Sequence, residues 1–206
     1  MEPAAEELIR SALHDVANVF SGIRGILDLS DPARPLSVRD RDRLDAVLRE
    51  GLSMVHRARS LTLGMVPERS VESPEAWKQA LLEQLQPLAT MFRAPLDIRC
   101  DAPATQGVPG PILREFVHAM ARLLLPYAGD SGIQVRCSPE SGVWKLEFLP
   151  AEAIPDCLLP GAKGRRDIAA RWAAFLIEAC QITLSIDGER LTALVNGLPL
   201  GARHQN

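Results

Sequence analysis

The chain has 206 residues, of which 47% are hydrophobic and 24% are charged, a composition typical of a folded soluble chain with room for two small domains or one larger one. Its formal net charge of −3 argues against nucleic acid as a partner, since phosphate binding requires a concentrated basic surface. No apolar run approaches the roughly 18 residues of a membrane span, and the N-terminal segment MEPAAEEL lacks the basic and apolar regions of a signal peptide, so we expect a cytoplasmic protein.

The first predicted helix begins at Pro3 and ends before Asp31, Pro32 and Pro35, because proline cannot continue a helical hydrogen-bond ladder. Its large apolar residues recur in steps of four and three, the pattern of a helix that packs along one seam. These residues are Ile9, Leu13, Val16, Phe20, Ile23 and Leu27. With Leu13, Phe20 and Leu27 at the a positions of a heptad, His14 takes a b position and is expected to point into solvent.

The neighbours of His14 suit chemistry at its ring. Asp15 can accept a hydrogen bond from one ring nitrogen and leave the other nitrogen free as a nucleophile. Asn18 lies one turn further on. Gly22 and Gly25 remove bulk where a partner would dock, at a cost of roughly 0.5–1 kcal/mol each in helix stability. The alternatives are a solvated surface histidine and a locally flexible or bent helix.

Ser37 and Asp40 form a pattern similar to a capping box, which begins a second helix that runs to about Leu63. Its apolar residues again recur at three- and four-residue spacing: Leu44, Leu48, Leu52, Val55, Ala58 and Leu61. The two helices form an antiparallel hairpin with one apolar seam per helix and too little core to be stable alone. We therefore expect a homodimer in which two hairpins form a four-helix bundle.

Equal rises of about 1.5 Å per residue on both helices place His14 opposite roughly residue 53, if the loop is centred near residue 33. Arg49, Ser53 and Arg57 are then its expected neighbours, and their guanidinium groups would bind a phosphoryl oxygen or an acidic partner. The alternative is that these arginines only solvate an exposed face. His56 lacks an adjacent acid and amide, and we interpret it as structural.

After a linker at residues 65–70, helices alternate with strands. Ser73 and Pro74 cap a helix that runs through Leu88. Two further helices (111–127 and 166–180) and five strands of alternating polarity are predicted, the strands at 96–100, 133–137, 144–148, 182–186 and 191–195. Such alternation is typical of half-buried antiparallel strands. The sequence thus predicts an α+β fold, with a helical hairpin domain at residues 1–66 and an α/β sandwich at residues 67–206, whose helices cover one face of a mixed sheet.

Four cysteines occur singly, at Cys100, Cys137, Cys157 and Cys180. Without a CxxC pair, neither a zinc site nor a redox motif is indicated. We interpret all four as small core residues.

The pattern of His14, Asp15 and Asn18, followed by the apolar residues Phe20, Ile23, Ile26 and Leu27, resembles the dimerisation and histidine-phosphotransfer domain of two-component signalling proteins. Residues 11–32 look particularly like the start of the ChpT-type histidine phosphotransferases. The resemblance implies that His14 is the phosphoacceptor, Asp15 its general base and Asn18 an aid to transfer or dephosphorylation. The implied partner is a response-regulator receiver domain, expected to dock beside His14 on Val19, Ser21, Gly22, Ile23, Gly25, Ile26, Arg49, Ser53 and Arg57.

The order of elements over about residues 73–200 is similar to that of the ATP-binding domain of histidine kinases. The nucleotide-binding residues of that family do not follow. Ala119 and Leu123 stand where the family has amides for magnesium and phosphate, and residues 150–154 replace its Asp-x-Gly-x-Gly motif. Gly161 and Gly164 alone are left of the glycine-rich lid, and one GxxG pair is a weak signal. We expect a degenerate ATPase-like domain without ATP binding, in which His118 is incidental.

These resemblances favour a histidine phosphotransferase, in which His14 relays a phosphoryl group between receiver aspartates. The chain itself would bind no cofactor, and Mg²⁺ is expected from the receiver. Such a protein is a phosphoryl carrier rather than an ATP-dependent kinase. Two alternatives stay open: a non-catalytic dimeric adaptor of kinase shape that binds response regulators, and an ATP-dependent histidine kinase with divergent motifs.

Overall fold

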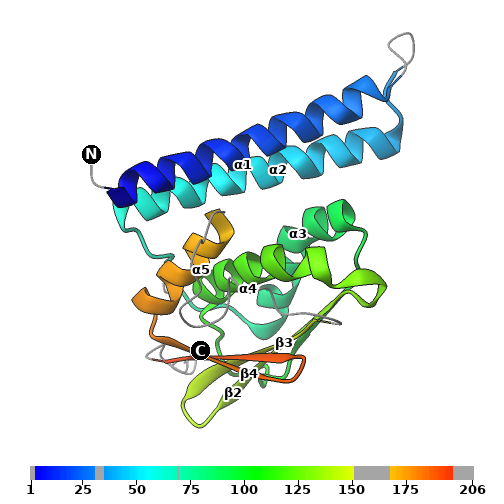
Figure 1. Ribbon diagram of the computed structural model, residues 1–206. Helices are drawn as coiled ribbons and strands as arrows, with labels where there is room; N and C mark the ends of the chain where they lie inside the picture. Colours follow the sequence, from blue (N-terminus) through cyan, green and yellow to red (C-terminus); the bar gives the residue numbers. More distant parts are fainter. Residues whose placement is uncertain (1–2, 31–34, 69, 151–167, 197–206) are drawn as a thin grey trace.

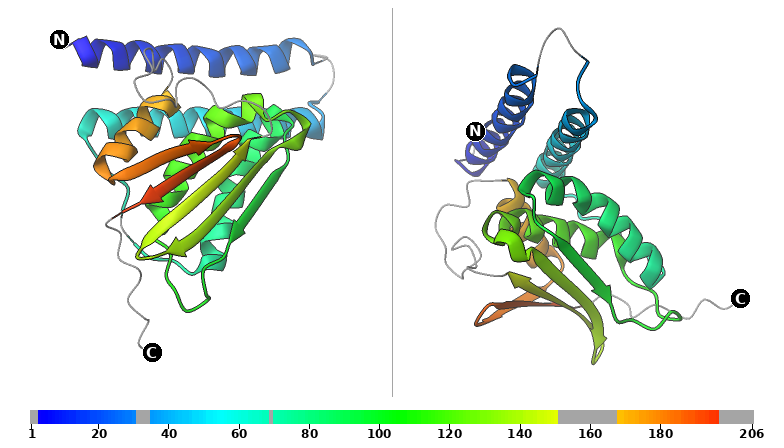
Figure 2. Two further views of the ribbon diagram at one scale, coloured as in Figure 1. Left: turned by 60° about the horizontal axis from the view of Figure 1, so that its bottom comes forward. Right: turned by 90° about the vertical axis from the view of Figure 1, so that its right-hand side faces the viewer.

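The computed structural model describes residues 3–30, 35–68, 70–150 and 168–196. Two long helices, α1 (Pro3–Asp28) and α2 (Val38–Leu63), lie on one side of three shorter helices, and a β-sheet lies on the other side (Figure 1). In Figure 1 and in the left view of Figure 2, α2 lies between α1 and much of the α/β part, while α1 also contacts α5 directly. No helix in the described ranges is sufficiently long and apolar to cross a bilayer.

The ends of α2 follow local sequence signals. The Ser37 hydroxyl oxygen accepts a hydrogen bond from the Asp40 backbone N–H at 3.1 Å, which satisfies one of the free donors at the start of the helix. At the other end, Gly64 adopts the left-handed conformation with φ +62°, which glycine reaches without a steric penalty. The predicted boundaries of this helix are therefore confirmed.

Close packing between a glycine and a valine joins α1 to α2. A Cβ atom added at Gly51 would lie only 2.9 Å from Cγ1 of Val19, so the two backbones approach each other where Gly51 has no side chain. A Cβ atom added at Gly22 would lie at an ordinary 3.6 Å from Cγ1 of Val47. These contacts fix the register of the two antiparallel helices.

The sheet has five strands in the order β1-β2-β3-β5-β4. Their bounds are β1 Leu96–Cys100, β2 Ile133–Glu140, β3 Val143–Pro150, β4 Ile182–Asp187 and β5 Arg190–Val195. Strands β1 and β2 are parallel, whereas the other neighbouring pairs are antiparallel. The predicted mixed sheet is confirmed. The antiparallel pairing expected of residues 96–100 is wrong, because a crossover that contains a helix joins β1 to β2 and brings the chain back in the same direction.

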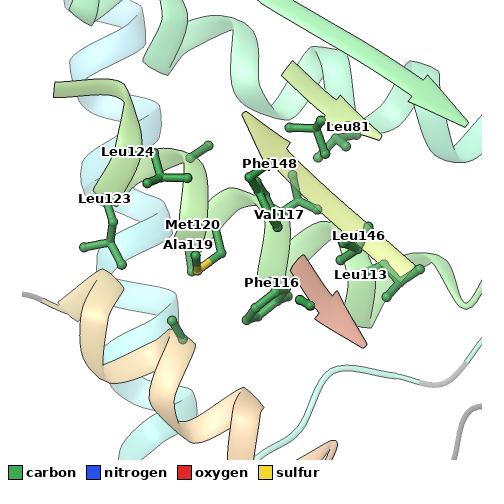
Figure 3. Packing of buried hydrophobic residues seen from close by; sticks show 14 of the residues in the cluster. Leu81, Leu113, Phe116, Val117, Ala119, Met120, Leu123, Leu124, Leu146 and Phe148 are labelled. Atoms are coloured by element: carbon green, nitrogen blue, oxygen red, sulfur yellow. The ribbon is translucent and has the colours of Figure 1, made fainter. Parts of the chain in front are cut away.

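Three helices cover one face of this sheet: α3 (Pro74–Phe92), α4 (Gly110–Leu124) and α5 (Ile168–Ala179). Their apolar side chains and those of the sheet form one core (Figure 3). At its centre, the rings of Phe116 on α4 and Phe148 on β3 meet edge to face with centroids 6.3 Å apart. The α-helix predicted at 111–127 ends at Leu124 and continues as a 3₁₀ turn over Leu125–Tyr127.

The long helices leave an apolar stripe exposed on this chain. The stripe consists of Leu13, Phe20 and Leu27 on α1 and Leu48, Leu52 and Val55 on α2. Leu13 and Phe20 are 65% and 66% exposed, although both occupy seam positions of the heptad pattern. By contrast, Ala46 and Met54 of α2 are buried against the rest of the chain.

The packing of Gly51 predicts a specific pattern of stabilities. Gly51→Ala gains about 1 kcal/mol in helix propensity, but overpacking against Val19 costs about 1–3 kcal/mol, so we expect a net loss of about 1 kcal/mol in the free energy of unfolding. Gly25→Ala has open space around the new Cβ and is expected to gain about 0.5–1 kcal/mol. Urea unfolding measures both effects. In a Val19→Ala background, we expect Gly51→Ala to be stabilising. If the effects of the two substitutions on the free energy of unfolding simply add, the close contact between Gly51 and Val19 is contradicted.

Candidate functional site

His14 lies on the outer surface of α1, with its side chain 67% exposed. Its Nδ1 atom is 3.1 Å from Oδ1 of Asp15 and 3.4 Å from Nδ2 of Asn18. The imidazole, the carboxylate and the carboxamide singled out in the sequence are thus in contact around one ring nitrogen. The ring points into solvent, as its heptad position predicts.

Asp15 is a buried carboxylate, only 6% exposed at its side chain, although its neighbour His14 faces solvent. Its second oxygen, Oδ2, accepts a hydrogen bond of 2.9 Å from the backbone N–H of Ile168, the first described residue of α5. One turn before His14, the hydroxyl oxygen of Ser11 accepts a hydrogen bond of 3.0 Å from Nε of Arg171. The site of His14 therefore lies where α1 meets α5, which sequence reasoning missed because the bonded residues are 153 positions apart.

The register of the hairpin differs from the sequence-based count. Since Val19 packs against Gly51 and Gly22 packs against Val47, His14 lies level with Val55 and His56 rather than with residue 53. The count was wrong because close packing, and not the midpoint of the loop, sets the register. His56, for which the sequence indicates a structural role, is an exposed residue of α2.

Arg57 does not belong to the surface around His14. Its side chain is 1% exposed, and its Nε donates a hydrogen bond of 3.0 Å to Oε2 of Glu115 on α4. Glu115 also accepts hydrogen bonds of 3.1 Å each from Gln84 on α3 and Trp172 on α5. The prediction of a partner-binding Arg57 is therefore wrong, because this face of α2 packs against α4 and α5.

The other two predicted residues of α2 also turn away from a shared site with His14. Arg49 is exposed and pairs with Asp45 at 2.7 Å along its own helix. Ser53 lines a cavity of about 190 Å³ between α2, α3 and α4, together with Arg49, Glu50 and His118.

The proposed docking residues of α1 divide into two groups. Val19 and Gly22 are half-buried and also face α2, where Val19 lies against Gly51 and Gly22 lies near Val47. Ser21 and Gly25 are exposed, and Ile23 and Ile26 are half-buried. A cavity of about 250 Å³ borders this second group and is lined by residues of α1, α2 and α3: Gly22, Gly25, Ile26, Leu29, Arg43, Ala46, Val47, Thr90 and Met91.

A second buried ionic contact joins α2 to α4. The side chains of Glu50 and His118 are buried, 4% and 2% exposed, and Oε2 of Glu50 lies 3.4 Å from Nε2 of His118. The other carboxylate oxygen of Glu50, Oε1, lies 3.3 Å from Nε of Arg122. Burial raises the pKa of Glu50. Burial, with the nearby charges of Arg57 and Arg122, holds the pKa of His118 well below its usual range. His118 is therefore part of the packing between α2 and α4 and is not incidental.

A signal for these contacts was present in the sequence. Glu50 and Arg57 stand seven residues apart on α2, and with the buried Ala46 and Met54 they recur in steps of four and three along one face of the helix. Glu115 and Arg122 also stand seven residues apart on α4, with the acid again first and the base second. Complementary charges at equal helical spacing match two antiparallel helices, and this is how they pair.

The cysteines are closer together than their spacing in the sequence indicates. Cys100 of β1 and Cys137 of β2 are register partners in the parallel pair. A hydrogen bond from Cys137 lowers the pKa of the half-buried Cys100 thiol to about 7, and the same contact with burial raises the pKa of Cys137. Cys157, residues 151–154, Gly161 and Gly164 lie outside the described residues. Within the described ranges, no group of three or more His, Cys, Asp or Glu residues is placed to hold a metal ion.

No family model and no curated protein matches this chain. Solved structures resemble it at low sequence identity. The histidine kinase AdeS of Acinetobacter baumannii has a TM-score of 0.54 and 11% identity over 91% of this chain and 96% of its own. Full-length ShkA in complex with AMPPNP has a TM-score of 0.55 and 15% identity over 96% of this chain, which spans 47% of ShkA. A bacterial phosphotransferase has a TM-score of 0.50 and 12% identity over 93% of this chain and 94% of its own. These similarities show a histidine-kinase-like fold.

Arg57 and Arg49 of α2 are expected to differ in how much they contribute to stability. Arg57→Met leaves Glu115 without its buried cationic partner, and we expect a loss of about 3 kcal/mol in the free energy of unfolding. Arg49→Met removes an exposed pair and is expected to change it by less than about 1 kcal/mol. Urea unfolding monitored by tryptophan fluorescence distinguishes them. Equal effects of the two substitutions would show that the contact of Arg57 with Glu115 does not hold α2 against α4.

Proposed function

We propose that the chain is a histidine phosphotransferase, in which His14 accepts a phosphoryl group from an aspartyl phosphate on a receiver domain and passes it to another receiver. The observation that carries the proposal is an exposed imidazole whose Nδ1 contacts a buried carboxylate, on a histidine-kinase-like fold. This arrangement leaves Nε2 facing solvent as a nucleophile.

The transfer needs little from this chain beyond positioning. The lone pair of Nε2 attacks phosphorus, the Nε2–P bond forms, and the P–O bond to the acyl carboxylate breaks, with its electron pair leaving on the receiver. The ring thereby becomes cationic, and its Nδ1–H is held by Asp15, which stabilises the charge and can take the proton. The Mg²⁺ of the reaction would belong to the receiver. Asn18, 3.4 Å from the ring, is placed to orient a transferring oxygen.

The described residues give little support for ATP binding. Ala119 and Leu123 are buried apolar residues of α4, 0% and 5% exposed, and neither side chain has an atom that binds magnesium or phosphate. Their position in the core supports a relay that receives an activated phosphoryl group rather than a kinase that uses ATP. The adaptor of kinase shape is the second candidate, since the same fold and surface would bind a receiver without transfer.

The receiver would dock on the outer face of α1 beside His14. Ser21 and Gly25 provide an exposed surface of small residues, and Ile23 and Ile26 provide partly exposed apolar area. The adjacent cavity of about 250 Å³ would accept an apolar side chain of the partner.

The homodimer is also a proposal, and the apolar stripe on α1 and α2 supports it. Its six large apolar side chains are exposed and recur at three-, four- and seven-residue spacing, and exposed apolar area of this kind marks an interaction site. A second hairpin of the same sequence presents the same stripe, so a twofold four-helix bundle would bury both.

His14→Ala is expected to abolish phosphoryl acceptance from phosphorylated receivers while the dimer persists, because the ring lies outside the apolar stripe. His56→Ala is the matched control, since it removes the other exposed histidine of the hairpin and should leave acceptance unchanged. The measurement is transfer of radiolabel from each phosphorylated receiver of the same genome. Equal labelling of the wild-type protein and the His14→Ala variant would contradict the proposal. Binding of a receiver without any labelling of the wild-type protein would favour the adaptor.

Leu48→Asp is expected to convert the dimer to a monomer, because a charge at the centre of the bundle is costly to desolvate. Leu29→Asp introduces the same charge at an exposed position outside the stripe and should leave the dimer intact. Sedimentation at several protein concentrations tests both. A monomeric wild type would contradict the bundle.

A further inference from the structure

We infer that the N-terminus of α5 acts as a positioning element for His14: it holds the Asp15 carboxylate so that the ring carries its proton on Nδ1 and leaves Nε2 free. The role of this contact in phosphoryl transfer rests on the proposed function. The state of the ring does not, and it is measurable without any receiver.

Two contacts compete for one atom of the His14 ring. Nδ1 of His14 lies within reach of an acceptor, Oδ1 of Asp15 at 3.1 Å, and of a donor, Nδ2 of Asn18 at 3.4 Å. A neutral imidazole carries one proton, so Nδ1 either donates to Asp15 or accepts from Asn18. The shorter contact is also the one to a carboxylate, and hydrogen bonds with an ionised partner are roughly twice as strong as neutral ones. The Asp15 contact therefore prevails, and the lone pair lies on Nε2.

This choice depends on the orientation of the carboxylate. Adjacent residues of a helix do not normally face each other, so Asp15 reaches His14 only with its side chain held in one direction. The bond of 2.9 Å from the Ile168 N–H to Oδ2 holds it, leaving Oδ1 directed at the ring. The first N–H groups of a helix lack partners within the helix and carry its positive dipole end, so the start of α5 suits an ionised carboxylate.

A second contact keeps α5 in place against α1. Nε of Arg171, three residues into α5, donates to the Ser11 hydroxyl, which lies one turn before Asp15 on the same helix. The α/β part of the chain thereby gains a role that requires no nucleotide: through a backbone donor it sets which nitrogen of the His14 ring carries the proton.

The test replaces the donor. Proline lacks a backbone N–H but fits the first turn of a helix, so Ile168→Pro removes the bond to Asp15. Ile168→Ala is the matched control, because it also removes the buried isoleucine side chain but keeps the N–H. Nitrogen-15 shifts of the ring in protein labelled at histidine report the tautomer, and the His14 signals are identified by their loss in His14→Gln.

We expect the wild-type ring and the Ile168→Ala ring to be mainly in the Nδ1–H form, and the tautomer ratio to fall about tenfold in Ile168→Pro, as expected when a charge-assisted hydrogen bond loses its fixed geometry. A wild-type ring mainly in the Nε2–H form, or equal ratios in the proline and alanine variants, would overturn the inference.

A second variant decides the question if Ile168→Pro does not fold. In Asp15→Asn, the Ile168 N–H still requires an acceptor, so the amide oxygen is held there and the NH₂ group faces Nδ1 of His14. The ring is then expected to invert to the Nε2–H form. A ring that stays Nδ1–H would show that α5 does not orient this side chain. If the tautomers behave as expected but His14 accepts no phosphoryl group, the inference stands and the proposed function fails.

Discussion

The carboxylate of Asp15 is the point on which the arrangement of the site depends. One of its oxygens contacts the ring of His14 and the other accepts the first described N–H of α5, so a single buried side chain connects an exposed histidine to the α/β part of the chain. A carboxylate out of water requires such partners, because an unpaired buried charge is strongly unfavourable. The same contacts that satisfy Asp15 also fix its direction. The contacts that make burial of the Asp15 carboxylate possible are therefore the same ones that orient the His14 ring.

Buried ionic contacts connect α2 to α4. Glu50 pairs with His118 and Arg122, and Arg57 pairs with Glu115, so two ionic contacts with the opposite charge order lie along one helix interface. Each helix carries its acid before its base, so an antiparallel arrangement pairs opposite charges, whereas reversing α2 would bring like charges together. The α/β part of the chain thus contacts both long helices, α2 through these ionic contacts and α1 through α5.

Much of the fold follows from local sequence patterns. Heptad spacing gives both long helices, Ser37 and Gly64 mark the ends of α2, and alternating polarity gives all five strands.

What the sequence did not show depends on contacts between distant residues. The register of α1 on α2 follows from Val19 packing at Gly51, and the parallel pairing of β1 with β2 depends on the crossover between them. The triad of His14, Asp15 and Asn18 could be read from one helix, but the partner of Asp15 on α5 could not. Arg57 was misplaced because a charged residue at core spacing was interpreted as exposed.

The central claim is that Nε2 of His14 is the atom that receives the phosphoryl group. Nitrogen–phosphorus coupling in histidine-labelled protein, after transfer from a phosphorylated receiver, identifies the bonded nitrogen directly. The account predicts a single phosphohistidine, at His14 and on Nε2, because Asp15 occupies the Nδ1 side of the ring. A phosphoryl group on Nδ1 of His14, or on any other residue of the chain, would contradict it.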